Sequence, residues 1–86
     1  MAYSVELAPA ARRQLKKLDP PIQKRIFRRL KRLENQPRPG SAVQLQGATD
    51  TFYRIREGDW RIIYTIENDR LIVLVVRIAH RSTAYR

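Results

Sequence analysis

The sequence predicts a small α+β protein, a single domain over residues 1–86, with a mostly antiparallel, twisted sheet and a two-helix hairpin packed on one face. Residues 52–66 predict a β-hairpin, because aromatic and β-branched residues flank a Gly-Asp pair. Residues 71–79 form an almost continuous apolar run, which is typical of a buried strand. Residues 9–36 place apolar side chains at helical spacing. The predicted order of elements is therefore β-α-α-β-β-β.

The composition is strongly basic. Of the 86 residues, 18 are Lys or Arg and 8 are Asp or Glu, which gives a formal net charge of +10 at pH 7. This balance favours a polyanionic partner, such as nucleic acid, the ribosome, an acidic protein or an anionic membrane surface, over a soluble basic domain with no such partner. There is no cysteine, and no apolar run approaches the roughly 20 residues that span a bilayer. Because no signal peptide is recognisable, we expect a cytoplasmic protein.

The first half of the chain predicts one strand and two helices. Residues 2–7 alternate apolar and polar side chains, as a short strand does. Residues 9–18, with a proline in the first turn, predict the first helix. Asp19 and Pro20 fit the N-cap and first position of a second helix that runs to about Gln36. Its buried stripe is expected to consist of Ile22, Ile26, Leu30 and Leu33, widened by Phe27.

The second half predicts the rest of the sheet. Residues 43–50 are ambiguous and fit a short extended piece followed by a turn at Gly47. The hairpin over 52–66 is expected to close with a type II′ turn, because Gly58 suits a loop position that needs a positive φ. A second turn at 67–70 leads into the buried apolar strand, and a short polar tail follows.

The two-residue turn of this hairpin fixes which side chains share a face. One face is expected to join the core through Tyr53, Ile55, Trp60, Ile62, Tyr64 and Ile66. The other, the arginine face, carries Arg54, Arg56 and Arg61, with Arg56 opposite Arg61. Like charges opposite each other destabilise a sheet, so this face calls for an anion. Guanidinium groups bind phosphate oxygens bidentately and stay charged, which favours a phosphate site. A solvated face with arginine stems over apolar surface is the alternative.

Three residues near the C-terminus could complete such a site. His80 is the only histidine and has an unperturbed pKa near neutrality. If the second turn also has two residues, Arg61 faces Val76 and His80 shares the arginine face, although a β-bulge would reverse this placement. Arg81 lies beyond the strand end. The Tyr85 phenol could accept a proton only if neighbouring cations lowered its pKa. An ordinary surface role is the alternative for each.

The second helix adds a separate basic surface. Lys24, Arg25 and Arg28 belong to a run of cations that suits phosphate contacts or an acidic partner, with a plain solvated helix face as the alternative. The sequence contains no Gly-rich phosphate loop, no metal-ligand spacing and no Ser-His-Asp set. We therefore expect any enzymatic activity to need neither a metal nor a nucleotide cofactor.

Several blocks together resemble the RelE/ParE toxin superfamily. They are Tyr53-Arg-Ile-Arg-Glu-Gly-Asp-Trp-Arg-Ile-Ile-Tyr64, then Val73-Leu-Val-Val-Arg-Ile-Ala-His-Arg81, and the closing Ala84-Tyr-Arg86. The segment Leu45-Gln-Gly47 and the start of the chain fit as well, so the resemblance covers essentially the whole sequence. It implies a RelE-like fold and a small toxin that an acidic, RelB-like antitoxin neutralises in a hetero-oligomer.

The RelE branch of that superfamily implies a specific reaction. Such toxins enter the ribosomal A site and cleave the mRNA there. By resemblance, Arg54 and Arg56 contact the RNA, Arg61 stabilises the scissile phosphate, and Arg81 supports the leaving group. Tyr85 would act as general base on the 2′-OH, and His80 is a second candidate for proton transfer. Two alternatives remain: a ParE-like toxin that inhibits gyrase by binding, and a non-catalytic basic nucleic-acid-binding module.

Overall fold

The computed structural model describes residues 2–47 and 49–84 and confirms the α+β class. The elements are β1 (Ser4–Leu7), α1 (Pro9–Lys16), α2 (Pro20–Leu33), β2 (Val43–Gln46), β3 (Thr51–Glu57), β4 (Trp60–Glu67), β5 (Ile72–His80) and α3 (Arg81–Ala84). The predicted order holds with two additions. The ambiguous segment provides the short strand β2, and the tail begins with the short helix α3. No helix in this part of the chain is long and apolar enough to cross a membrane.

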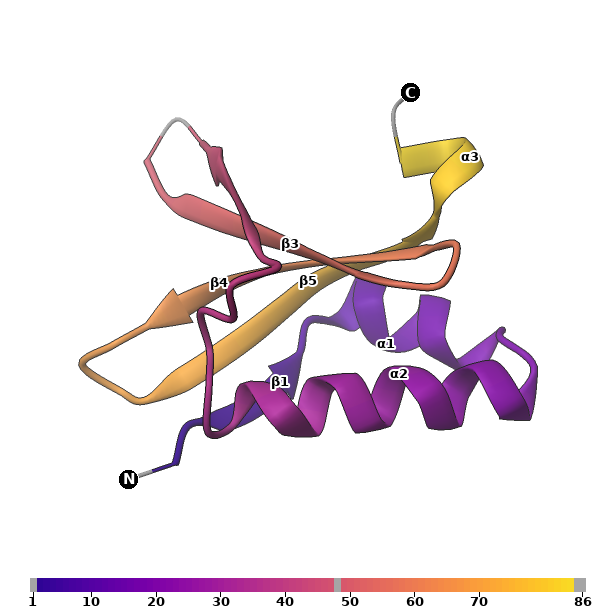
Figure 1. Ribbon diagram of the computed structural model, residues 1–86, viewed down its shortest axis with the longest axis horizontal. Coiled ribbons are helices and arrows are strands. Elements are labelled where there is room, and N and C mark those ends of the chain that lie inside the picture. The colour runs from indigo at the N-terminus through magenta and orange to yellow at the C-terminus, as the bar shows by residue number, and fades with distance from the viewer. Residues whose placement is uncertain (1, 48, 85–86) are drawn as a thin grey trace.

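Strand β5 lies inside a five-stranded sheet of order β1-β5-β4-β3-β2. The pairings of β5 with β4, β4 with β3 and β3 with β2 are antiparallel, whereas β1 runs parallel to β5. Figure 1 shows α1 and α2 together on one face of the sheet, and α3 on the opposite side. One face is thus covered by the helical hairpin, as predicted.

A short connection joins α1 to α2, and a side chain of α2 holds it in place. Pro20 lies in the first turn of α2, and Asp19 occupies the N-cap position without a capping hydrogen bond from its side chain. Gln23 donates from Nε2 to the carbonyl oxygens of Leu15 and Leu18, at 3.0 and 2.9 Å. The Leu15 carbonyl also accepts from the Leu18 backbone N–H at 3.1 Å, so Gln23 adds a second donor to it. The two Gln23 bonds link the start of α2 to the end of α1.

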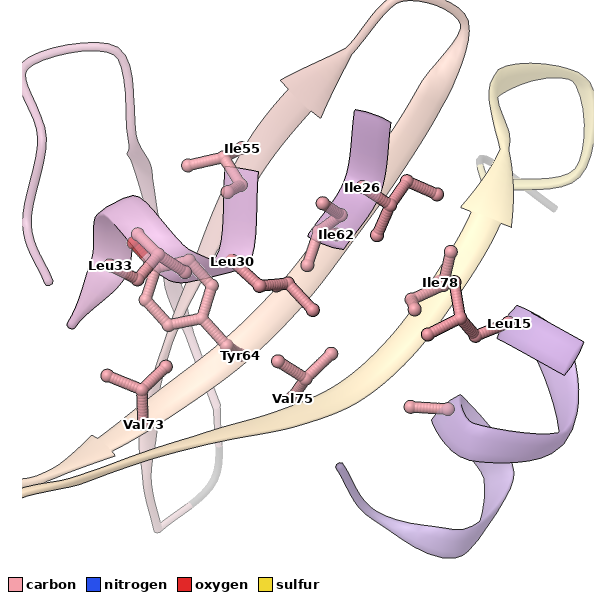
Figure 2. Close-up of a cluster of buried hydrophobic side chains, with 11 residues drawn as sticks. Leu15, Ile26, Leu30, Leu33, Ile55, Ile62, Tyr64, Val73, Val75 and Ile78 are labelled. Carbon is pink, nitrogen blue, oxygen red and sulfur yellow. The ribbon is translucent and has the colours of Figure 1, made fainter. Parts of the chain in front are cut away.

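The face predicted to be the core is the one that the helices cover (Figure 2). Ile55, Ile62 and Tyr64 are fully buried there. The helices contribute five buried side chains: Ala11, Leu15, Ile26, Leu30 and Leu33. The Tyr64 hydroxyl donates a 2.7 Å hydrogen bond to the carbonyl oxygen of Pro37, in the loop after α2. This bond ties that loop to the centre of the sheet.

Phe27 does not belong to this core, contrary to the prediction. It is 54% exposed, whereas Ile26 is 0% exposed. The buried row of α2 consists of Ile26, Leu30 and Leu33, whose spacing of four and three residues keeps them on one side of a helix. Phe27 stands one residue further round the helix, where it lines an open hollow with Val5 and Leu7 of β1 and stays exposed.

The hairpin of β3 and β4 has the predicted turn and register. Gly58 has φ 59°, and among the described residues Leu71 is the one non-glycine residue with a positive φ. Asp59 therefore has a negative φ, which fits a type II′ turn. Tyr53 lies opposite Tyr64, and their rings stack with centroids 5.6 Å apart. Both faces of this hairpin are as predicted.

The β4–β5 pairing differs from the prediction in two ways. Glu67 lies opposite Ile72, so the turn contains four residues rather than two, and Leu71 closes it with φ 54°. In addition, the register shifts at Ile63 and Tyr64, where β5 contains one extra residue, Val76. A β-bulge of this kind reverses the alternation of side chains beyond it. Odd-numbered residues of β5, such as Val73 and Val75, therefore face the core before the bulge, whereas even-numbered residues, such as Ile78, face it afterwards.

Candidate functional site

Strands β3 and β4 place three arginines on the sheet face away from α1 and α2. Arg56 lies opposite Arg61, and Arg54 lies opposite Ile63. In Figure 1 this face is the upper surface of the sheet, with α3 on the same side. The prediction that Arg54, Arg56 and Arg61 share one face is confirmed.

Arg61 is the most deeply buried arginine of the arginine face. It is only 5% exposed, and its Nη1 atom is buried, as is Nε of Arg54. Arg56, directly across from Arg61, is exposed. A guanidinium keeps its charge even when buried, and an anion that reaches it leaves bulk water, where the attraction would be weaker. The arrangement suits a phosphate whose negative charge increases during a reaction.

A fourth arginine, Arg77, lies on the same face, and the sequence analysis missed it. Arg77 is half-buried and lies opposite Ile63, whose other neighbour is Arg54. The two-residue turn expected from the sequence places Arg77 among the core residues. The four-residue turn alone would leave it there, because two added residues keep the same alternation, and the one-residue bulge at Val76 moves it outward. One signal was present: Arg77 is the only charged residue in the apolar run 71–79, and a charge there needs an open face.

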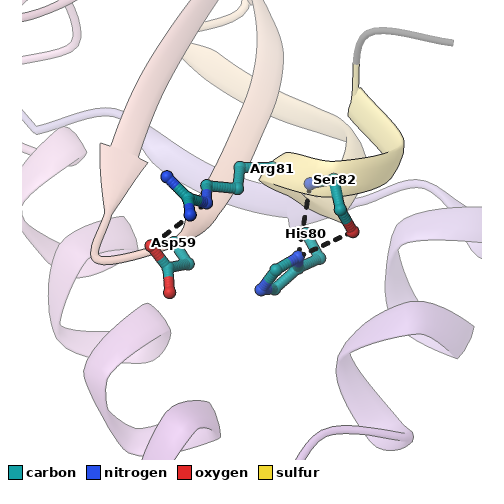
Figure 3. Close-up of polar contacts among 4 residues, drawn as sticks. All are labelled: Asp59, His80, Arg81 and Ser82. Atoms are coloured by element: carbon teal, nitrogen blue, oxygen red, sulfur yellow. Dashed lines mark hydrogen bonds and ion pairs between the residues drawn. The ribbon is translucent and has the colours of Figure 1, made fainter.

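Arg81 begins α3 beside the β3–β4 turn, as Figure 3 shows. Its backbone N–H donates to the carbonyl oxygen of Asp59 at 2.7 Å. Its Nε lies 3.7 Å from Oδ1 of Asp59, and both side chains are 64% exposed. An ion pair this exposed is weak, so a phosphate can compete with Asp59 for Arg81. The structure brings Arg81 to the end of the arginine face, although not into its centre.

His80 does not lie on the arginine face, contrary to the prediction. It lies opposite Trp60, and the two rings meet edge to face with centroids 5.2 Å apart. The bulge at Val76 is the reason. His80 Nδ1 lies 2.9 Å from Ser82 Oγ and accepts a hydrogen bond from the Ser82 backbone N–H at 3.3 Å. His80 thus contacts the first turn of α3 from the side that the helical hairpin covers (Figure 3).

Tyr85 lies outside the described residues, and its role as general base stays a prediction. Helix α3 ends at Ala84, directly before it. Between residues 2 and 84, position 48 excepted, no group of three or more carboxylate or imidazole side chains is placed to hold a metal ion.

The second basic surface lies along α2. Arg25, Arg28, Arg29 and Arg32 line a hollow of about 120 Å³ together with Glu57 from the end of β3. Arg25 Nε is 3.9 Å from Glu57 Oε2. The prediction grouped Lys24 with Arg25 and Arg28, but Lys24 does not line this hollow. The hollow contains four guanidinium groups and one carboxylate, which favours an anionic ligand.

Comparisons with known proteins identify the family and agree with the fold. Residues 5–85 match the family described as the ParE toxin of type II toxin-antitoxin systems. Toxin RelG of Mycobacterium tuberculosis is 31% identical, over 100% of this chain and 99% of the relative. The RelE–RelB complex of Pyrococcus horikoshii contains a chain with a TM-score of 0.83 and 26% identity, with coverage of 98% of this chain and 100% of that one.

A second complex, RelBE2 of Mycobacterium tuberculosis, gives a TM-score of 0.82 at 27% identity, over 94% of this chain and 100% of the matched chain. The family match covers nearly the whole sequence, and the relatives carry RelE-like names. The sheet order, the helical hairpin and the sequence thus lead to one conclusion. The chain belongs to the ParE toxin family of type II toxin-antitoxin systems, in the RelE-like branch of the RelE/ParE superfamily.

Proposed function

We propose that this toxin is an endoribonuclease that cleaves mRNA in the ribosomal A site and so inhibits translation in the cytoplasm. The observation that carries the proposal is the arginine face. There the buried Arg61 of β4 lies between the exposed Arg56 of β3 and Ala79 of β5. A cation at the floor of a polar face is suited to stabilise charge that develops on a phosphate. The net charge of +10 suits an RNA surface such as the ribosome.

The proposed reaction needs a base, cationic stabilisation and support for the leaving oxygen. Tyr85 removes the proton from the 2′-OH, which attacks the adjacent phosphorus. Arg61 stabilises the extra negative charge on the phosphorane. The bond between phosphorus and the 5′ oxygen then breaks and leaves a 2′,3′-cyclic phosphate, while Arg81 stabilises the departing 5′ oxygen, which takes a proton from water. Arg54 and Arg56 hold the RNA strand in line. The role of Tyr85 requires guanidinium groups close to its phenol, because nearby cations favour the phenolate form.

His80 has a positioning part in this scheme. It lies on the other face of the sheet from Arg61, but it contacts Ser82 in the first turn of α3. Arg81 begins that turn, and Tyr85 follows it in the sequence. His80 therefore supports the segment that carries both residues, rather than transferring a proton itself.

The partners of the toxin follow from its charge and its family. The relatives from Pyrococcus horikoshii and Mycobacterium tuberculosis were solved as complexes with their antitoxins. We expect this chain to form a hetero-oligomer with an acidic, RelB-like antitoxin, since an acidic chain complements its surplus of cations. Lys24, Arg25 and Arg28 of α2 are exposed and are proposed to contact ribosomal RNA.

Primer extension on a reporter mRNA after brief induction tests the activity. Cuts confined to the translated region are expected with the wild-type protein. They should fall by about 100-fold or more in Arg61→Ala, because one cation that stabilises a transition state contributes that much. Arg70→Ala is the matched control: it also removes one arginine, but from the β4–β5 turn, where Arg70 is exposed and pairs with Glu67. Equal cutting by both variants contradicts the proposed role of Arg61.

Gyrase inhibition is the second candidate, because the matching family model is that of ParE toxins. The two candidates separate in the same induction. An endoribonuclease stops protein synthesis first and leaves plasmid supercoiling intact. A gyrase inhibitor relaxes the plasmid while protein synthesis continues.

A further inference from the structure

We infer that Arg77 binds a second phosphate of the substrate, one nucleotide away from the phosphate held at Arg56 and Arg61. The arginine face would then grip two consecutive phosphates of one RNA strand. The identity of the ligand as single-stranded RNA rests on the proposed function. The existence of a second phosphate position rests on the register of three strands.

Two rows of side chains cross the arginine face, and each row takes one residue from each of β3, β4 and β5. The register gives Arg56–Arg61–Ala79 as the row nearer the β3–β4 turn and Arg54–Ile63–Arg77 as the next row. Residues two apart on a strand are separated by about 6.8 Å. This spacing is comparable to that of successive phosphates along an RNA strand. Each row therefore offers two guanidinium groups to one phosphate.

The two rows differ in the distance between their arginines. In the first row the arginines are direct neighbours, whereas in the second row Arg54 and Arg77 lie on either side of Ile63, about 9.6 Å apart at the backbone because strands are about 4.8 Å apart. All three residues of the second row are half-buried. An arginine side chain is long enough to reach over the apolar Ile63 from either side, so both guanidinium groups can contact one phosphate there.

The bulge is what makes this arrangement possible. It falls at Ile63 and Tyr64, directly beside the second row. Without it, the alternation that buries Val75 and Val73 would direct Arg77 into the core beside them. Bulges often re-aim a side chain near a functional site. A fourth cation on the arginine face raises the positive potential of that face. Like charges close together repel one another, and a bound RNA strand would offset this repulsion.

A binding experiment without the ribosome tests the inference. The probes are two 2′-O-methyl trinucleotides of one sequence, which cannot be cleaved because the nucleophile is blocked. One has two charged phosphates, and the other has a neutral methylphosphonate in place of one of them. Wild-type protein should bind the doubly charged probe about tenfold more tightly, as one charge-assisted contact is worth about that factor. In Arg77→Ala this preference should shrink to less than about twofold.

Arg70→Ala removes the same charge from the turn that joins β4 and β5, away from the arginine face, and should keep the tenfold preference. Arg77→Lys should restore part of it, and thermal unfolding of each variant shows that the fold is intact. A solely structural role of Arg77 would weaken both probes equally. A preference that survives in Arg77→Ala, or one absent from the wild type, overturns the inference. Because the experiment measures binding without a ribosome and without cleavage, it can be interpreted even if the proposed endoribonuclease activity is wrong.

Discussion

The hydroxyl group of Tyr64 gives the sharpest quantitative test of the fold. It is fully buried and donates to the Pro37 carbonyl at 2.7 Å. Tyr64→Phe removes the donor and leaves that carbonyl without it, which should cost about 1–2 kcal/mol of unfolding free energy. In a domain of this size, the melting temperature should fall by about 4–16 °C. Tyr3→Phe is the control, because its hydroxyl bonds to Asn68 at an exposed site and its loss should cost much less.

The same hydroxyl makes stability depend on pH in a defined direction. Burial raises the pKa of Tyr64 to about 12, against about 10 in an unfolded chain. Because the folded-state pKa is the higher one, the contribution is complete below pH 10 and is lost as the pH rises through 12. A difference of about two pKa units corresponds to at most about 2.7 kcal/mol.

Urea unfolding at pH 8 and pH 11.5 measures this loss. The wild-type protein should lose more stability between the two pH values than Tyr64→Phe does. Lysines and the other tyrosines titrate in both proteins, so their effects cancel in the comparison. If the two proteins lose the same amount, the raised pKa of Tyr64 is wrong and the hydroxyl does not couple folding to pH.

Two further changes test the turn and the core. Gly58→Ala should destabilise the protein by about 1–2 kcal/mol, since φ 59° strains any residue with a side chain. Gly40→Ala should be nearly neutral, because a Cβ there meets nothing within 4 Å. Thermal unfolding measures both changes. Ile26→Ala should cost about 2–5 kcal/mol in urea unfolding, since it leaves a cavity in the core, while the adjacent, 54% exposed Phe27→Ala should cost under about 1 kcal/mol. Equal losses within either pair would contradict the assigned turn or the assigned helix face.

The sequence was sufficient wherever structure is local. The turn at Gly58 fixes the β3–β4 register through two residues with distinct conformational preferences, so the core face and three of the four arginines on the arginine face followed from it. The β4–β5 turn gives no comparable signal. Leu71, a residue that rarely takes a positive φ, occupies the position where a glycine would have revealed a longer turn.

The sequence does not reveal the bulge at Val76 either, because this residue lies within a run of apolar residues. Its effect is nevertheless large: the bulge exchanges His80 and Arg77 between the two faces. Phe27 was misplaced for a related reason, since helical spacing gives the direction of an apolar stripe but not how much of its width is buried.

The pairing of β1 with β5 has a consequence for the order of folding. Hairpins of neighbouring strands close short loops, so β3, β4 and β5 can pair early. Strand β1, by contrast, joins β5 across almost the whole described chain, and closing so long a loop has a larger entropic cost. Ser4–Leu7 is also a short edge strand, which makes it a natural first site of local unfolding. We therefore expect amide hydrogens of β1 to exchange faster than those of β4, while the three strands that carry the arginines remain paired.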